Sequence, residues 1–252
     1  MPYSLPQEIL DLIIDHLHDD PQTLKTCCIV SKVWIHWTRR HLFNHLKFRF
    51  KGRDIGQWRE TFPDPLNSPS HHTRTLSIYF PELVTTEDTN SLLTFCGVST
   101  LIVVVSSMHR RNLSLAPLCG FSFTVRSLRM KFGEYQSFEV LDLIYSLPLL
   151  EDLSLVCNYG RQRFGVWNNT NFTSPRFTGT LELRFLRGMR LFACRLLDLP
   201  NGIHFKKIAV YWSSQDDVGL TMDLVAKCSR TLECLEIRNN MMGVFPSAII
   251  TN

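Results

Sequence analysis

A short apolar segment recurs along most of this chain at a spacing of 25 to 28 residues. The repeated segments read LSIYF, LIVVV, LRMKF, LSLVC, LELRF, IAVYW and LEIRN, and they begin at Leu76, Leu101, Leu128, Leu153, Leu181, Ile208 and Leu235. The first, third and fifth residues are apolar in every segment except the last, where Asn239 departs from the rule. Such alternation predicts strands, and a period in the twenties with an L-x-L strand is typical of leucine-rich repeats.

The intervals between these strands have helical character, so the expected fold class is α/β. The clearest helical stretches are residues 88–96, 138–147, 188–197 and 219–228. Strand, turn and helix repeated in this way predict a curved solenoid over residues 73–252, with about seven parallel strands inside and helices outside. The repeats are degenerate, because the asparagine that usually follows the strand survives only as Asn158 and Asn240. The last strand is followed only by NMMGVFPSAIITN, which is too short and apolar for a polar terminal cap and leaves open whether the C-terminus is truncated.

The inner face of this solenoid is the first candidate site. Side chains alternate along a strand, so the second and fourth residues of each segment point away from the core. These positions place the aliphatic Ile102 and Val104 beside the cationic Arg129 and Lys131. Exposed apolar patches tend to mark contacts, which favours a protein substrate with an apolar residue flanked by acidic ones. The alternative is that a loop or a chain end covers Ile102 and Val104. The candidate substrate-binding residues on the strands are Tyr79, Ile102, Val104, Arg129, Lys131, Arg184 and Tyr211.

The longest connection, residues 158–177, is a second candidate contact. Arg161 and Trp167 give it the arginine and aromatic chemistry that is enriched in interface anchors. Such a loop is either a binding element or a simple insertion.

The first fifty residues carry three short helical patterns. SLPQEILDLIIDHL predicts a helix from Pro6 to His18, with proline in its first turn and a capping box between Ser4 and Gln7. Further helices are expected over residues 21–30 and from about residue 31 to 42. Asp20 and Ser31 are the expected N-caps of these two helices.

The first of these helices is apolar over an unusually wide arc. Its apolar residues spread over roughly 200° of the helix surface, whereas an amphipathic surface helix needs a narrower stripe. They are Ile9, Leu10, Leu12, Ile13, Ile14 and Leu17. Three short helices cannot cover so wide a face, so either the rest of the chain covers it or a partner does. We therefore expect part of residues 5–17 to be exposed if a partner is required.

Residues 1–50 resemble an F-box. The resemblance is carried by LPQEILDLIIDHL and LKTCCIVSKVWIHWTRRHLF, and VSKVW with RRHLFNHLKF is similar to the version abundant in mushroom-forming fungi. It implies a module that binds a Skp-type adaptor and, through it, a cullin ubiquitin ligase, and a chain that serves as the substrate-recognition subunit without catalytic activity of its own. The implied adaptor-binding residues are Leu5, Pro6, Ile9, Leu10, Ile13, Leu24, Val30 and Trp34, of which the last three either join the contact or form the core of the module. Residues 51–72, rich in proline and serine, are expected to form a linker with one short helix from Ile55 to Phe62.

Sequence motifs for catalysis and for metal binding are absent. The chain has no glycine-rich phosphate loop, no G-x-S-x-G elbow and no HExxH. His16 and His18 precede Cys27 and Cys28, but this spacing does not suit a zinc site, and adjacent cysteines on a helix point about 100° apart. No enzyme activity, cofactor or metal is therefore expected.

Two alternative classes of function stay open. One is a scaffold that binds no adaptor, with its first helices packed on the solenoid. The other is a nucleic-acid-binding protein that uses the basic stretch 47–53, in which Phe48 and Phe50 alternate with cations. We favour a short strand with its charged side in water for this stretch, so nucleic acid is a disfavoured partner.

Charge, apolar run length and cysteine usage limit where in the cell the chain is expected to be. The formal net charge is +4, which is too weak to indicate nucleic acid alone. The longest apolar run, LIVVV, is too short to span a bilayer, and no signal-peptide pattern follows Met1. Eight cysteines without a CxxC pair are expected to be reduced, so the expected location is cytoplasmic or nuclear with no membrane partner.

Overall fold

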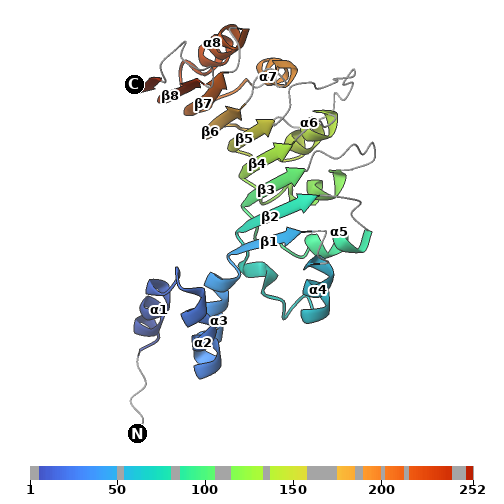
Figure 1. The fold of residues 1–252 in the computed structure, drawn as a ribbon, viewed down its shortest axis with the longest axis vertical. Coiled ribbons are helices and arrows are strands. Elements are labelled where there is room, and N and C mark those ends of the chain that lie inside the picture. The colour runs from blue at the N-terminus through green and yellow to red at the C-terminus, as the bar shows by residue number, and fades with distance from the viewer. Residues whose placement is uncertain are drawn as a thin grey trace.

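A nine-stranded sheet runs through most of the molecule. The computed structural model describes residues 6–49, 54–80, 86–105, 115–132, 137–157, 175–184, 190–199, 202–212, 216–239 and 248–251. Within these ranges the strands lie side by side in chain order from β1 to β9. Figure 1 shows a curved ladder of strands with helices along one side and three N-terminal helices set apart at one end. The fold is α/β with a mostly parallel, solenoid-like sheet.

The seven predicted strands are confirmed. They are β2 (Thr75–Phe80), β3 (Thr100–Val105), β4 (Ser127–Phe132), β5 (Asp152–Cys157), β6 (Thr180–Arg184), β7 (Lys207–Trp212) and β8 (Cys234–Asn239). Each pairs in parallel with the next, and the register places equivalent residues of successive repeats beside one another, as with Leu76, Leu101 and Leu128. The leucine or isoleucine that opens each repeated segment is buried. Because side chains alternate along a strand, one face of the sheet is the core and the other faces solvent.

Backbone hydrogen bonds at the strand entrances join one repeat to the next. The carbonyl of Asn44 accepts from the N–H groups of Arg74 and Thr75, both at 2.9 Å, and the carbonyl of Arg74 accepts from Ser99 and Thr100 at 2.9 Å each. The same arrangement recurs at the carbonyls of Ser99, Arg126, Gly179 and Lys206. We call this series the carbonyl ladder. It requires no particular side chain at these positions.

Helices cover the outer side of the sheet. They are α4 (Asp54–Thr61), α5 (Thr86–Leu92), α6 (Ser137–Tyr145), α7 (Arg190–Leu197) and α8 (Asp216–Cys228). Each overlaps an interval predicted to be helical. Two 3₁₀ helices, η2 (Pro69–His72) and η3 (Ala116–Phe121), were not predicted. Leu118 and Phe121 of η3 are buried in the solenoid core, so a tight turn there supplies the layer that α-helices supply elsewhere.

The sheet begins earlier than the predicted boundary. Strand β1 (His45–Arg49) pairs in parallel with β2, and Phe48 is buried in the solenoid core. Ile55 of α4 is buried in the same core, and Trp58 packs against it. The described part of residues 51–72 therefore belongs to the first repeat and is not a free linker. The change from one core to the other falls between Leu42 and His45.

The last strand breaks the parallel pattern. Strand β9 (Ala248–Thr251) pairs antiparallel with β8, so the chain turns back along the edge of the sheet. The apolar AIIT segment is not one of the repeated segments, and the sequence analysis did not predict this strand.

The N-terminal module consists of α1 (Gln7–His16), α2 (Pro21–Val30) and α3 (Lys32–Leu42). Asp20 and Ser31 cap α2 and α3 as predicted, because their side chains accept from backbone N–H groups in the first turn. The start of α1 differs from the prediction. Pro6 is its N-cap and not its first helical residue, and the Gln7 side chain donates to Asp11 at 2.6 Å. Ser4 lies outside the described residues.

Candidate functional site

The N-terminal module has a small core of its own. Ile14, Leu24 and Cys27 are buried together, and four half-buried residues pack around them: Leu17, Trp34, Trp37 and Leu42. This cluster is separate from the solenoid core among the described residues. The closest helix pairs are α2 with α3 and α1 with α3, while α3 also contacts η2 of the first repeat. The module is therefore joined to the solenoid through one helix, and α1 is left on the far side.

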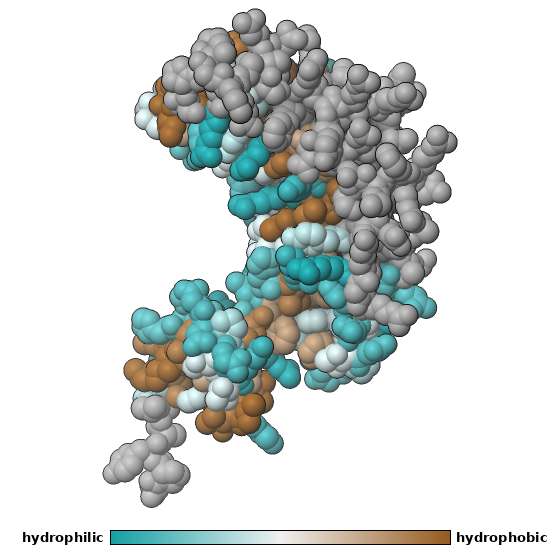
Figure 2. Space-filling model, in the orientation of Figure 1, coloured by the Kyte–Doolittle hydropathy of each residue, from teal (hydrophilic) through white to brown (hydrophobic). Residues whose placement is uncertain are grey.

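Large apolar side chains are exposed on this module. Six of them lie within residues 9–33, out of thirteen such residues in the part of the chain that the structure describes. They are Ile9 (43% exposed), Leu12 (56%), Ile13 (40%), Ile29 (86%), Val30 (67%) and Val33 (55%). We call them the N-terminal apolar surface. Figure 2 shows hydrophobic colour gathered on the module at the lower left. The expectation that part of residues 5–17 is exposed is confirmed.

The implied adaptor-binding residues separate into three groups. Pro6, Ile9, Ile13 and Val30 are exposed, and Leu10 and Trp34 are half-buried. Leu24 is 1% exposed and belongs to the module core, which is the second of the two roles left open for it; its side chain faces α1 and α3. Leu5 lies outside the described residues.

Three exposed residues were missed by the sequence analysis. Leu12 lies on the wide apolar arc of α1, so the width of that arc could have placed it among the contact residues. Ile29 and Val33 flank the turn between α2 and α3, and only the packing of Leu24 and Cys27 against α3 shows which side of α2 is left in solvent.

The inner face of the sheet carries aligned rows of side chains. The strand register puts Ile102 beside Arg129 and Val104 beside Lys131, as the repeat predicted. The row through the second residue of each segment is Lys47, Ser77, Ile102, Arg129, Ser154, Glu182, Ala209 and Glu236. The row through the fourth is Arg49, Tyr79, Val104, Lys131, Val156, Arg184, Tyr211 and Arg238. We call these the inner rows.

The central part of the inner rows is cationic and aliphatic. Arg129 and Lys131 are exposed, whereas Ile102 and Val104 are half-buried. Among the described residues neither cation takes part in an ion pair. Tyr79 is half-buried, with the Lys47 ammonium 4.6 Å from the centre of its ring. Arg161 and Trp167, the two candidates of the long connection, lie outside the described residues.

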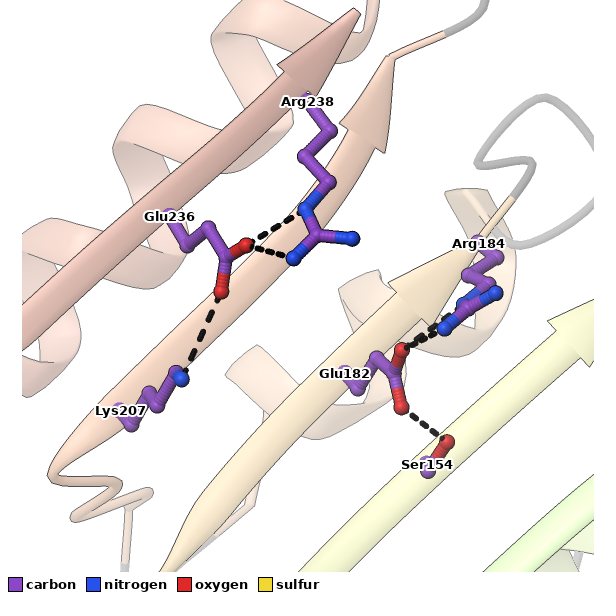
Figure 3. Close-up of polar contacts among 6 residues, drawn as sticks. All are labelled: Ser154, Glu182, Arg184, Lys207, Glu236 and Arg238. Carbon is purple, nitrogen blue, oxygen red and sulfur yellow. Dashed lines mark hydrogen bonds and ion pairs between the residues drawn. The ribbon is translucent and has the colours of Figure 1, made fainter. Parts of the chain in front are cut away.

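Arginines flank a tyrosine at the other end of the rows. The guanidiniums of Arg184 and Arg238 lie 4.5 and 5.3 Å from the centre of the Tyr211 ring, and they come from the strands on either side of it. Glu182 accepts from Arg184 at 2.8 Å, and Glu236 accepts from Arg238. We call these five residues the arginine–tyrosine cluster. Figure 3 shows both pairs on the side of the sheet opposite the helices.

Both carboxylates of the cluster are ionised more readily than usual. Burial alone would raise the pKa of Glu182, but hydrogen bonds from Ser154, at 2.6 Å, and from Arg184 lower it overall. The hydrogen bond from Arg238, followed by the ion pair with Lys207 at 3.5 Å, lowers the pKa of Glu236. The cluster is therefore charged and internally paired at neutral pH.

A polar depression of about 160 Å³ separates the central cations from the cluster. Its lining includes Asp152, Ser154, Thr180 and Glu182, with Arg129 at one side. Asp152 accepts from the backbone N–H of Thr180 at 2.6 Å. This region of the inner face is anionic and hydroxyl-rich.

The described residues provide neither a metal site nor a membrane-spanning helix. No group of three metal-ligating side chains occurs among the described residues. Nor do they include a helix with the length and apolar character needed to cross a bilayer. Comparison with protein-family models, with curated proteins and with solved structures finds no match to this chain.

Proposed function

We propose that this protein is the substrate-recognition subunit of an Skp–cullin–F-box ubiquitin ligase. In this proposal residues 6–42 bind the Skp-type adaptor and the solenoid binds a protein substrate. The observation that carries the proposal is the N-terminal apolar surface on a module whose own core is complete without it. The F-box resemblance of the sequence supplies the identity of the partner.

The energetics favour a partner over a solvent-exposed surface. Complete burial of a valine, leucine or isoleucine side chain contributes roughly 1.5–3 kcal/mol. The six side chains are about half exposed, so covering them would contribute roughly 1 kcal/mol each. That sum is enough to support association after part of it is offset by the entropy cost of binding. An amphipathic helix placed in an apolar groove is a common way to use such a face.

The proposed protein performs no chemistry itself. It holds substrate and ligase in one complex, which raises the effective concentration of substrate lysines near the ubiquitin-carrying enzyme. A repeat scaffold suits this task, because its extended inner face can contact a substrate over several strands.

The two alternatives receive less support. A scaffold without an adaptor would use the solenoid to cover α1, yet Ile9, Leu12 and Ile13 of α1 remain exposed. For nucleic acid, Phe48 of β1 is buried and Lys47 already covers the Tyr79 ring, so neither of these rings offers a free stacking surface; Phe50, the other ring of the basic stretch, lies outside the described residues.

Co-purification with a Skp-type adaptor tests the proposal. We expect the tagged wild-type chain to capture the adaptor, and the double variant Ile9→Asp/Ile13→Asp to lose capture by at least tenfold, because two charges would be desolvated in the contact. Met222→Asp is the matched control, since Met222 is a 60% exposed apolar residue on α8, at the other end of the molecule.

Equal capture by wild type and the double variant would rule out this surface as the adaptor site. Loss of capture in Met222→Asp as well would show that the assay reports solubility and not a contact. Both positions are exposed, so thermal melts should confirm that the variants stay folded.

A further inference from the structure

We infer that the inner face binds an extended, acidic segment of a protein, with two acidic side chains about four residues apart. This inference rests on the proposed function only in treating the segment as substrate; the binding itself stands on the chemistry of the sheet.

The inner face holds the net charge of the whole chain. Counting the inner rows together with the row that opens each strand, β1 to β8 place seven cations and three carboxylates there, which leaves +4. The cations are Lys47, Arg49, Arg129, Lys131, Arg184, Lys207 and Arg238, and the carboxylates are Asp152, Glu182 and Glu236. The entire chain also has a formal charge of +4, so the rest of it is neutral on balance. A face with this excess attracts an acidic partner.

The first cationic position is β4. Arg129 and Lys131 are both exposed on this strand and form no ion pair within the described residues, although the charge of Arg129 contributes to the lowered pKa of Glu182. The neighbouring strands place aliphatic side chains on both sides: Ile102 and Val104 on β3, and Val156 on β5. An acidic residue with an apolar neighbour fits this arrangement, because the carboxylate meets the two cations and the apolar group covers the aliphatic side chains.

The second position is the arginine–tyrosine cluster, in which two arginine–glutamate pairs balance in charge and neighbouring Lys207 adds one positive charge. Each glutamate binds the Nε and Nη2 groups of its arginine, which leaves Nη1 without a partner among the described residues. Both guanidiniums are also held over the Tyr211 ring, and Figure 3 shows their pairing with the two glutamates. Because the side chains are already ordered, a carboxylate can bind there with little further loss of rotamer entropy.

The strand spacing sets the distance between these positions. Neighbouring strands lie about 4.8 Å apart, so β4 and β7, which carries Tyr211, are separated by about 14 Å. An extended peptide rises about 3.3 Å per residue and covers this distance in about four residues. The depression between them has Arg129 at one side and Glu182 at the other and adds the carboxylate of Asp152, which repels an acidic side chain. Acidic residues at positions i and i+4, with uncharged residues between them, therefore fit best.

A protein segment fits this face better than nucleic acid. Single-stranded nucleic acid needs free aromatic faces for base stacking, but Arg184 and Arg238 flank the Tyr211 ring and Lys47 covers Tyr79. Glu182 and Glu236 would also repel a continuous phosphate backbone.

Fluorescence anisotropy with synthetic peptides tests the inference on the full chain. The probes are labelled 12-residue peptides with two glutamates at i and i+4 and a valine beside each, the same peptide with glutamines, one with the glutamates adjacent, and oligo(dT). We expect the i,i+4 peptide to bind at least tenfold more tightly than the other three, and binding to weaken with added salt. Lys131→Glu should weaken it about tenfold, whereas Lys227→Glu, an exposed lysine on the outer helix α8, should not.

Three results would overturn the inference: equal binding of the glutamine peptide, unchanged binding by Lys131→Glu, or tighter binding of oligo(dT). The double variant Ile9→Asp/Ile13→Asp should bind the peptide like wild type, because its substitutions lie on the N-terminal module. A chain that captures no adaptor but binds the i,i+4 peptide would refute the ligase proposal and leave this inference standing, and the opposite pair of results would do the reverse.

Discussion

The substitution Leu24→Ala should unfold the N-terminal module and leave the solenoid folded. Leu24 is 1% exposed and is one of only three buried apolar residues in the module core, whereas 41 such residues form the solenoid core among the described residues. Removing a buried leucine side chain typically costs about 2–5 kcal/mol of unfolding free energy. A core as small as that of the module supplies no more than about 3–5 kcal/mol, so this one change removes most of its stability.

Native-state hydrogen exchange followed by mass spectrometry measures this loss in each part separately. A loss of about 3 kcal/mol corresponds to roughly 100-fold faster exchange of the backbone amides in α2 and α3. Exchange in β3 to β5 should not change, because the two cores share no buried residue. Ile14→Val is the graded control: it removes one methylene from the same core and should accelerate exchange in the module only about fivefold, for about 1 kcal/mol.

The reasoning is refuted if Leu24→Ala accelerates exchange in the central strands as much as in α2. That result would mean that module and solenoid unfold as one cooperative unit despite their separate cores. The variant also links stability to function, since it should lose adaptor capture while keeping the affinity of the inner face for the acidic peptide.

Three further predictions concern pH and backbone. The pKa of Glu236 is lowered in the folded state, mainly by the hydrogen bond from Arg238. The stability that Glu236 contributes should therefore be complete above pH 4.5, the ordinary pKa of the group, and be lost as the pH falls below that value. Glu236→Gln should make the urea-unfolding midpoint depend less on pH in that range. Burial, followed by the charge of neighbouring His71, lowers the pKa of His72 from 6.5 to about 4. The unfolding free energy should therefore decline as the pH falls from 6.5 to about 4. His72→Gln should make this decline shallower in urea melts. Gly202 has φ of +68°, so Gly202→Ala should lower the unfolding free energy by about 1 kcal/mol, whereas Gly219→Ala, in α8 with open space around its Cα, should raise it by about 0.5–1 kcal/mol in thermal or urea melts.

The repeat made the sheet predictable, because its period fixes register as well as strands. Arg184, Tyr211 and Arg238 are each 27 residues apart, so their alignment across β6, β7 and β8 follows from the sequence. Their contacts do not follow, because the direction of each guanidinium depends on the glutamate two residues before it on the same strand. The antiparallel β9 was missed because it lies outside the repeat.

The N-terminal module was predictable in outline only. The wide apolar arc of α1 correctly indicated an exposed face, but an arc does not tell which residues turn inward. Ile13 and Ile14 follow one another in the sequence and point about 100° apart within that arc; Ile13 is 40% exposed and Ile14 only 1%. For the same reason the sequence left open whether Leu24 joins the contact or the core, since burial in a small core depends on how three helices cross.

The carbonyl ladder has a consequence for how this chain can change in evolution. The bonds of the carbonyl ladder are made by main-chain groups, so they do not depend on the side chains of the inner rows; between β5 and β6 the Asp152 carboxylate takes the place of the second bond. Mutations can therefore alter the rows one residue at a time while the architecture persists. A gene that encodes such a sheet can drift from one binding preference to another through folded intermediates, and duplicated copies can diverge in what they recognise without first having to invent a new fold.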